Sequence, residues 1–368
     1  MHGVKMKDNL NVSNLLRIYE TEISKNVKNK KKLYDFEINK MQYVEDIINM
    51  LNNGVVGHKH YNIFLIFEPK CRLVMSLSVK DKVINHFVTR YILEAKLSKY
   101  LDCRNVATRK GMGTDYAIRK VIKYINILKR KYKTFYVLKL DISKYFYSID
   151  HGVLKGLLID KLDDYEYNIV SDIIDTTNKE YINKTINKLK EDRDIPNYLY
   201  GKGLPIGNMT SQFLSIYYLY KLDYFIVHDL GLKYYIRYMD DFIILDSDLE
   251  KLKEAKEKIV EKLEMEYKLK VNGKKTWINN MKYGFSFLGY TYKVINNKTI
   301  VRIKRSNIEK IKKRVKKVRY LFDNDKISYY SAFCSIMTYS NCYKFSDNNK
   351  IYRIIDRYWY HEKQILFF

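Results

Sequence analysis

The stretch Ile236–Leu245 reads IRYMDDFIIL and sets two adjacent carboxylates, Asp240 and Asp241, between apolar, β-branched and aromatic residues. This pattern predicts two short strands joined by a tight turn with the acidic pair at its tip. Burying two aspartates beside so much apolar surface costs several kcal/mol each unless a partner compensates. A divalent cation is the most economical partner for paired carboxylates, whereas a solvated Asp turn is the plain alternative.

A second acidic position lies upstream, in the strand-like run Tyr136–Phe146, where Asp141 is the polar interruption. An Asp directly after a strand is often a helix N-cap. Here Asp150 stands just before the apolar helical pattern of residues 151–158 and is the better candidate for a cap. No local structural role therefore accounts for Asp141, and this favours a place for its carboxylate in a functional site.

Three carboxylates on two strands suit a two-metal site for phosphoryl transfer. Two ions about 3.5–4 Å apart can clamp the attacking and leaving oxygens and neutralise the charge that develops between them. We expect Asp141 and Asp240 to be the principal metal ligands and Asp241 to be a weaker one. The backbone carbonyl of Ile142 is a further candidate oxygen ligand.

Further motifs, together with the two acidic stretches, resemble those of reverse transcriptases in kind and in order. These motifs are Cys71–Val74 with Lys80–Ile84, Arg109–Thr114, Gly203–Gln212, Lys270–Thr276 and Phe287–Tyr290. They cover roughly residues 60 to 295, and their joint order is more specific than any one of them. The resemblance implies a right-hand α+β polymerase with fingers, a palm of antiparallel sheet and helices, and a helical thumb.

The expected organisation has four parts along the chain. A basic helical extension covers residues 1–55, the fingers 56–135, the palm 136–296 and the thumb 297–368. Within the palm, the polar segment at about 175–197 is expected to be an insertion packed outside the site.

The resemblance also implies residues that contact the incoming dNTP. Phe146 would lie under the deoxyribose and exclude a 2′-hydroxyl, which is the group that distinguishes RNA from DNA. Arg72 and Lys70 would face the triphosphate, and Gly207 would let the backbone approach the nascent base pair. The plain alternatives are a core aromatic for Phe146 and solvated surface side chains for the two cations.

Lys275 follows the turn signal Asn272–Gly273 and is expected to protonate the leaving pyrophosphate as a general acid. Lys274 is a close competitor for this role. Thr114 is expected to cap the helix that follows it. The resemblance also implies residues that contact the template or the primer: Arg109, Lys110, Gln212, Phe287, Leu288, Gly289, Lys313 and Lys317. Arg109 and Lys110 stand beside a Gly-x-Gly turn, and Phe287–Gly289 belong to the primer grip.

The last two of these lysines belong to a predicted basic amphipathic helix in the thumb. Ser306 and Glu309 form a capping-box pattern at its start. Apolar residues then recur at helical spacing over residues 308–321, and lysines and arginines cover the other faces. Such a helix suits the backbone of a template–primer duplex, and a helix lying on a membrane surface is the rival interpretation.

Composition agrees with a nucleic-acid partner. The chain has 68 Lys and Arg against 42 Asp and Glu, a formal charge of +26 that attracts polyanions. Its 36 tyrosines offer faces for base stacking, although an AT-rich genome explains most of them equally well. No apolar run is long enough to cross a bilayer, and the four cysteines lack paired metal spacing, so we expect a cytoplasmic protein without a membrane partner.

We therefore expect an RNA-directed DNA polymerase that uses two Mg²⁺ ions, with template RNA, a primer or cDNA strand, and dNTPs as partners. Ile206 and Gln212 resemble the enzymes of diversity-generating retroelements, whereas group II intron enzymes usually carry Gln and Pro there. That subgroup implies low fidelity at adenine and a small accessory protein. An antiphage-defence reverse transcriptase that copies a non-coding RNA is the alternative.

Two other functions are less favoured. A non-catalytic RNA-binding scaffold on the same fold is disfavoured because all three carboxylates are intact, although fold alone never guarantees chemistry. An intron maturase is disfavoured because little sequence follows the thumb.

Overall fold

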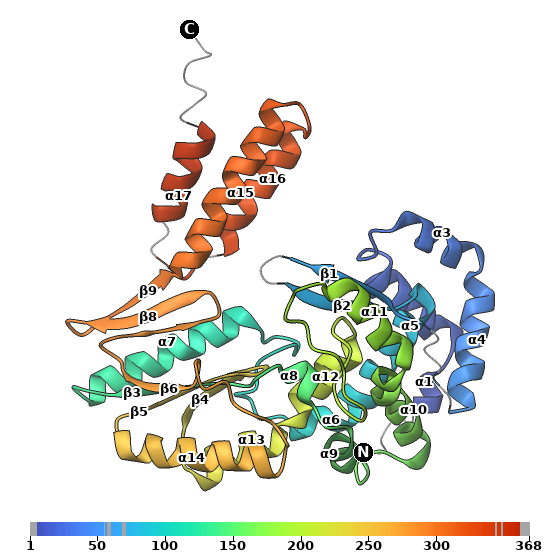
Figure 1. Ribbon diagram of the computed structural model, residues 1–368, viewed down its shortest axis with the longest axis horizontal. Helices are drawn as coiled ribbons and strands as arrows, with labels where there is room; N and C mark the ends of the chain where they lie inside the picture. Colours follow the sequence, from blue (N-terminus) through green and yellow to red (C-terminus); the bar gives the residue numbers. More distant parts are fainter. Residues whose placement is uncertain are drawn as a thin grey trace. The chain divides into compact units, whose positions relative to one another are not determined.

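The structure is a computed structural model that describes residues 6–54, 56, 60–67, 71–342, 344–346 and 349–360. The chain divides into two compact units, and each is described by itself. Unit 1 comprises Met1–Lys110, Leu140–Phe242 and Glu254–Thr276, and unit 2 comprises Gly111–Lys139, Ile243–Lys253 and Trp277–Phe368. Helices and antiparallel strands occur in both units (Figure 1), as predicted for the α+β class.

Unit 1 is mostly helical. Its helices are α1 (Met6–Asn9), α2 (Val12–Ile18), α3 (Lys30–Ile38), α4 (Lys40–Asn52), α5 (Val79–Val88), α6 (Ala95–Leu97), α8 (Tyr145–Ser148), α9 (His151–Leu158), α10 (Asp164–Ile174), α11 (Glu180–Lys190), α12 (Met209–Tyr218) and α13 (Tyr220–Tyr224). Short π or 3-10 turns extend some of them: η1 (Tyr19–Ile23), η2 (Thr89–Glu94), η3 (Ser98–Tyr100), η4 (Asp175–Asn178) and η5 (Phe225–Asp229).

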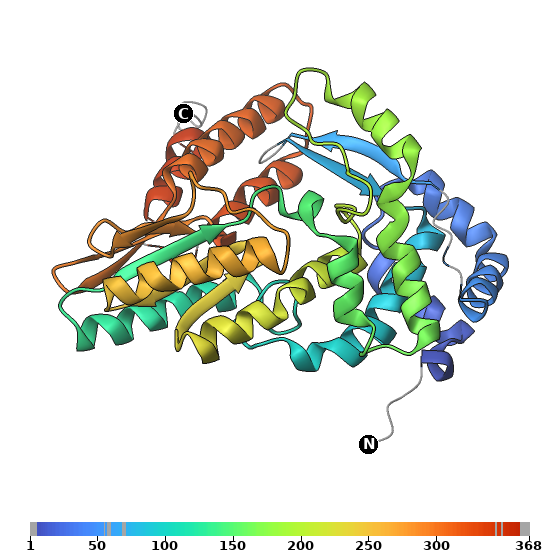
Figure 2. The same cartoon turned by 60° about the horizontal axis from the view of Figure 1, so that its bottom comes forward.

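A β-hairpin lies in unit 1, within the segment expected to form the fingers. Strands β1 (Asn62–Ile66) and β2 (Arg72–Ser76) pair antiparallel, from Asn62 opposite Ser76 to Ile66 opposite Arg72. One face of this two-stranded sheet is apolar and is covered by α11, which lies alongside β1 (Figure 2). A pair of strands needs such cover, because an isolated hairpin is marginally stable in water.

The segment predicted as an insertion at about 175–197 therefore supplies core residues. Ile182, Ile186 and Ile195 are buried in one cluster with Leu73 and Met75 of β2. Burial of a large aliphatic side chain stabilises the fold by about 1.5–3 kcal/mol. The segment thus stabilises the β1–β2 hairpin.

A four-stranded sheet carries the acidic residues at its strand ends. Its order is β4-β5-β3-β6, with β3 at Tyr136–Asp141, β4 at Tyr234–Tyr238, β5 at Asp241–Asp246 and β6 at Trp277–Asn280. Strands β3 and β6 pair antiparallel. Apolar side chains of β3 and β5 are buried, as expected for strands covered on both faces, and helix α14 (Leu249–Met265) follows β5.

Unit 2 contains a second, three-stranded sheet in the order β7-β8-β9, formed by Phe285–Phe287, Tyr290–Ile295 and Lys298–Ile303. Asn296 and Asn297 join β8 to β9, and both have positive φ, +47° and +58°. This is the geometry that a two-residue hairpin turn prefers, and Asn tolerates it well. Helix α7 (Thr114–Lys131) contacts β9, and the Thr299 hydroxyl donates to the Asn126 side chain over 2.7 Å.

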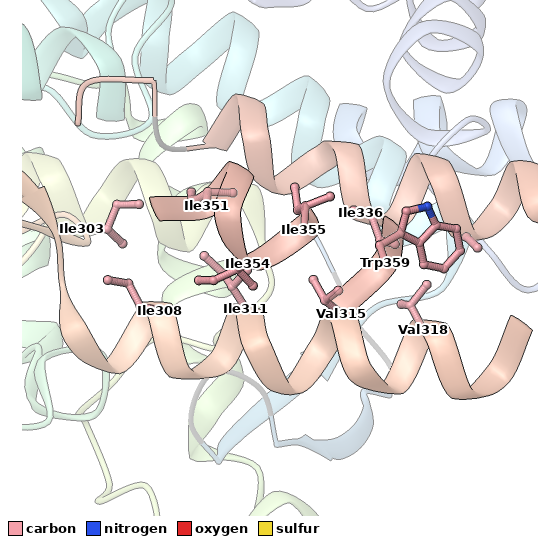
Figure 3. Packing of buried hydrophobic residues seen from close by; sticks show 11 residues of the cluster. Ile303, Ile308, Ile311, Val315, Val318, Ile336, Ile351, Ile354, Ile355 and Trp359 are labelled. Carbon is pink, nitrogen blue, oxygen red and sulfur yellow. The ribbon is translucent and has the colours of Figure 1, made fainter. Parts of the chain in front are cut away.

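Three helices and a terminal turn complete unit 2: α15 (Arg305–Asp323), α16 (Tyr329–Cys342), α17 (Asn349–Ile355) and η6 (Asp356–Tyr360). The predicted apolar face of α15 is confirmed, since Ile308, Ile311, Val315 and Val318 are all buried. Figure 3 shows these side chains meeting Ile336 and the side chains of the last helical segment, Trp359 among them. The basic residues consequently lie on the opposite, exposed faces of α15.

Two predicted helix caps are wrong. Thr114 lies inside the first turn of α7, and the cap position is held by Gly113 at φ +107°, with no side-chain cap bond. Helix α15 begins at Arg305, so Ser306 is also inside the helix and does not occupy its cap position. There the β7–β8 turn sets the helix start instead, because the Gly289 carbonyl accepts from the Lys304 amide over 3.0 Å.

Candidate active site

The predicted hairpin with acid at its tip is present. Strand β4 ends at Tyr238 and β5 begins at Asp241, so Met239 and Asp240 form the turn. Met239 has φ +56°, in the left-handed region, which costs a side-chain-bearing residue roughly 1–2 kcal/mol. Tertiary contacts must therefore hold this turn in place.

Asp141, the last residue of β3, lies beside a lysine. Its Oδ2 is 2.8 Å from the Nζ of Lys275, and its side chain is only 14% exposed. The loop that carries Lys275 runs along the end of β3, because the amide of Asn272 donates to the Asp141 carbonyl over 2.7 Å. The predicted turn at Asn272 is confirmed by the bond from the Lys275 amide to the Asn272 carbonyl, 2.9 Å. Of the two competing lysines, the structure therefore brings Lys275 to the carboxylate.

Asp240 lies within electrostatic reach of the same groups. Burial raises the pKa of its carboxyl above the ordinary value, and the nearby Asp141 carboxylate raises the pKa further. The Asp240 amide, Lys275 and Arg72 act in the opposite direction without cancelling the rise. Asp141, Lys275 and Arg72, which are far apart in the sequence, thus all lie within electrostatic reach of Asp240 in unit 1.

The donor set suits a hard divalent cation. Carboxylate and carbonyl oxygens are the ligands that Mg²⁺ prefers, and a divalent cation would relieve the repulsion between Asp141 and Asp240. Within the described part of the chain, no three acidic, His or Cys side chains come close enough to hold an ion by themselves. Asp241 begins β5 next to Asp240, and its side chain is half-buried.

Arg237, which the sequence analysis did not identify, also stabilises the turn. Arg237 of β4 is fully buried and donates through Nη1 to the Met239 carbonyl over 3.0 Å. Its other nitrogens bind the carboxylate of Asp223, at 2.7 Å through Nε and 2.5 Å through Nη2. Hydrophobic periodicity alone does not predict the Arg237–Asp223 ion pair, because an arginine in an amphipathic strand is expected on its exposed face.

Phe146 lies on the short helix α8 and is half-buried. Its carbonyl accepts from the amide of Leu204 over 2.7 Å, so the predicted sugar-contacting motif and the glycine-rich motif lie side by side. The adjacent Tyr145 hydroxyl donates to the carbonyl of Ser215 over 2.5 Å, which fixes α8 against α12.

Gly207 is required by the fold at its position. Its φ is +123°, and a Cβ there would come within 2.9 Å of the Met75 carbonyl oxygen in β2. The Ile206 carbonyl accepts from the Met75 amide over 2.8 Å, and this bond holds the loop on strand β2. Gly207 and the exposed Gln212 also line one cavity of about 370 Å³, together with Met209.

Comparison with known proteins agrees with this geometry. Residues 58–321 match the family described as reverse transcriptase (RNA-dependent DNA polymerase), which is more than half of the chain. The chain belongs to the reverse transcriptase family. The predicted family and fold class are thereby confirmed.

Among solved structures, this reverse transcriptase is similar to an apo telomerase from Candida tropicalis truncated from its C-terminal domain. The identity is 15% and the TM-score 0.48, with 67% of this chain and 55% of that chain covered. The reverse transcriptase chain therefore spans about half the length of that protein. None of the curated proteins matches the chain significantly.

Two of the cations expected at the nucleic acid belong to the first unit of the reverse transcriptase. Arg109 points back into its own loop, where Nη1 donates to the carbonyls of Asp102 and Asn105 over 2.6 and 2.9 Å. Lys110 is exposed. Arg72 begins β2 and is exposed, whereas Lys70 lies outside the described residues.

The predicted primer grip and thumb lysines belong to unit 2. Phe287 is buried at the end of β7, and Leu288 and Gly289 form a two-residue turn with φ +46° and +86°. Lys313 and Lys317 are exposed on α15. In the described part of the reverse transcriptase, no helix is both long and apolar enough to cross a membrane.

Proposed function

We propose that this chain is an RNA-directed DNA polymerase that copies template RNA into cDNA. The observation that carries the proposal is the meeting of Asp141 and Asp240 with Lys275 at the end of the palm strands. Two coupled carboxylates and a cation form the arrangement that nucleotidyl transfer needs, and membership of the family supports the same reaction.

In the proposed reaction the primer 3′-oxygen attacks the α-phosphorus of a dNTP. The new O3′–P bond forms while the bond from phosphorus to pyrophosphate breaks. The proton of the 3′-hydroxyl leaves to water, and the Lys275 ammonium donates a proton to the departing pyrophosphate. Arg72 would neutralise charge on the triphosphate, because a guanidinium forks onto phosphate oxygens.

Two Mg²⁺ ions are proposed as cofactors. Asp141 and Asp240 would be the main ligands, with Asp241 and the Ile142 carbonyl as further oxygens. When bound, the ions would stabilise the charge that develops on the attacking and leaving oxygens. The half-buried position of Asp240 and its repulsion from Asp141 support this assignment.

Asparagine variants of the carboxylates test the proposal directly. In primer extension on an RNA template, Asp141→Asn and Asp240→Asn should each abolish cDNA synthesis, while RNA binding and circular dichroism remain unchanged. Asp246→Asn, at the far end of β5, is the matched control and should retain synthesis. Synthesis by either active-site variant at the wild-type rate would refute the proposal.

We further propose that the enzyme is the low-fidelity type of diversity-generating retroelements, served by a small accessory protein. The observation in favour is the pair Ile206 and Gln212, at the two ends of the glycine-containing motif. Ile206→Gln should reduce misincorporation opposite template adenine, measured by sequencing the cDNA. An error spectrum identical to that of the wild type would favour the alternative, a defence-associated enzyme.

A further inference from the structure

The Arg237 guanidinium is held by more partners than an ordinary ion pair provides. Its Nε and Nη2 form a two-bond fork with Asp223, and Nη2 also donates to the Ile216 carbonyl over 2.9 Å. The Tyr235 hydroxyl donates to the same Asp223 carboxylate over 2.6 Å. Both charged side chains are 0% exposed.

Such a pair needs an explanation other than stability. Removing two charges from water is expensive, and apolar residues of similar volume often replace a buried ion pair without loss of stability. What apolar residues cannot replace is a hydrogen bond donated to a carbonyl. Arg237 donates such bonds to the carbonyls of Ile216 and Met239, and of these two the bond to Met239 reaches the turn that carries Asp240.

The carbonyl of Met239 belongs to the peptide group that leads directly into Asp240. Fixing this oxygen fixes the peptide plane, and with it the direction in which the Asp240 side chain leaves the backbone. Met239 is the strained residue of the turn, at φ +56°, and such conformations persist where surrounding contacts hold them. The Ser215 hydroxyl also contacts the Met239 sulfur, at 3.5 Å.

We propose that Arg237 is a positioning residue that, with Asp223 as its counterion, aims the Asp240 carboxylate at the catalytic metal. Arginine suits this task because one planar group reaches the carboxylate and the turn at once. Lysine, with a single ammonium, cannot reproduce both sets of bonds. This inference rests on the proposed polymerase function, because it concerns the same metal site.

The test uses a double variant in which the charges vanish together. Asp223→Leu/Arg237→Met removes the pair without leaving a lone buried charge, and it should fold with wild-type circular dichroism. We expect its kcat to fall about 10- to 100-fold, because a small misplacement of a reacting group costs that much. Half-maximal activity should require more Mg²⁺, while the KM for dNTP changes little.

Arg237→Lys is the second variant, since it keeps the charge beside Asp223 and removes the bond to Met239. It should show the same rise in the Mg²⁺ requirement. The matched control is Lys96→Met/Glu166→Gln, which removes another ion pair of unit 1, between the half-buried Lys96 and the buried Glu166. This control should lose stability and keep the wild-type Mg²⁺ dependence.

Binding of Mn²⁺, followed by electron paramagnetic resonance, gives a readout independent of catalysis. Weaker Mn²⁺ binding by the two Arg237 variants than by wild type and control is the expected result. A folded Arg237 variant with wild-type kcat and metal affinity would overturn the positioning role. Absence of polymerase activity in the wild type would instead refute the proposed function, and the Mn²⁺ comparison would still test the positioning role.

Discussion

The Nζ of Lys275 lies 2.8 Å from Oδ2 of Asp141, although 134 residues separate the two in the sequence. The neighbouring Lys274 is exposed, and the structure shows no such bond from its side chain to the carboxylate. Adjacent lysines in a turn point in different directions, so only one of them reaches the site.

This contact predicts that the two lysines differ sharply in function. Lys275→Ala should reduce kcat by about 10²- to 10⁴-fold, the range that loss of a general acid produces. Lys274→Ala should leave kcat nearly unchanged. Single-nucleotide incorporation under pre-steady-state conditions measures both, and equal losses in the two variants would contradict the assignment of Lys275.

Gly207 provides a prediction about stability. Gly207→Ala places a Cβ 2.9 Å from the Met75 carbonyl at φ +123°, and overpacking of this kind costs about 1–3 kcal/mol. Gly156→Ala, in helix α9, is the control, because nothing lies within 4 Å of its added Cβ. The control should stabilise the protein by about 0.5–1 kcal/mol, since alanine favours a helix over glycine. Urea unfolding measures both changes, and a neutral Gly207→Ala would show that the loop is not clamped on β2.

Asp240 predicts a stability that depends on pH. The folded protein raises the pKa of this carboxyl through burial and the Asp141 carboxylate, so the folded state binds the proton more tightly than the unfolded chain does. The ionised carboxylate therefore destabilises the fold above the raised pKa, and this penalty disappears as the pH falls toward the ordinary value of 3.8.

Asp240→Asn should accordingly raise the melting temperature in EDTA at pH 8, and the gain should shrink as the pH falls toward the ordinary pKa of the carboxyl. Many active sites carry such a cost, because function requires a charge that folding disfavours. Differential scanning calorimetry at high and low pH measures the effect. A melting temperature unchanged at pH 8 would mean that the ionised Asp240 carboxylate does not destabilise the folded protein.

The thumb lysines provide a prediction about nucleic-acid binding. Lys313 and Lys317 are exposed on the basic side of α15, and removing one phosphate-binding lysine should lower the salt slope of binding by about 1. Lys313→Ala/Lys317→Ala should therefore weaken binding to an RNA–DNA duplex and lower the slope by about 2. Lys256→Ala/Lys258→Ala, on α14, is the control. Equal slopes in the two double variants, from fluorescence anisotropy at several salt concentrations, would exclude a role of α15 in binding.

Local patterns in the sequence predicted a good part of this protein. The acidic turn around Asp240, the apolar face of α15 and the cap at Asp150, whose side chain accepts from the Val153 amide over 3.1 Å, are all confirmed. Each depends on residues within a few positions of one another, so periodicity and turn chemistry suffice to identify them. The caps at Thr114 and Ser306 were wrong, because α7 already begins at Thr114 and α15 at Arg305.

The sequence by itself determined the family, the acidic residues and the basic helix, because short motifs, their order and the local periodicity of residues suffice to identify them. Only the tertiary structure decided which side chains meet: Lys275 with Asp141, the segment around Ile182 with the β1–β2 hairpin, and Arg237 with Asp223 next to the turn. Side-chain contacts between distant segments depend on packing and on the burial of charge, which no window of neighbouring residues contains.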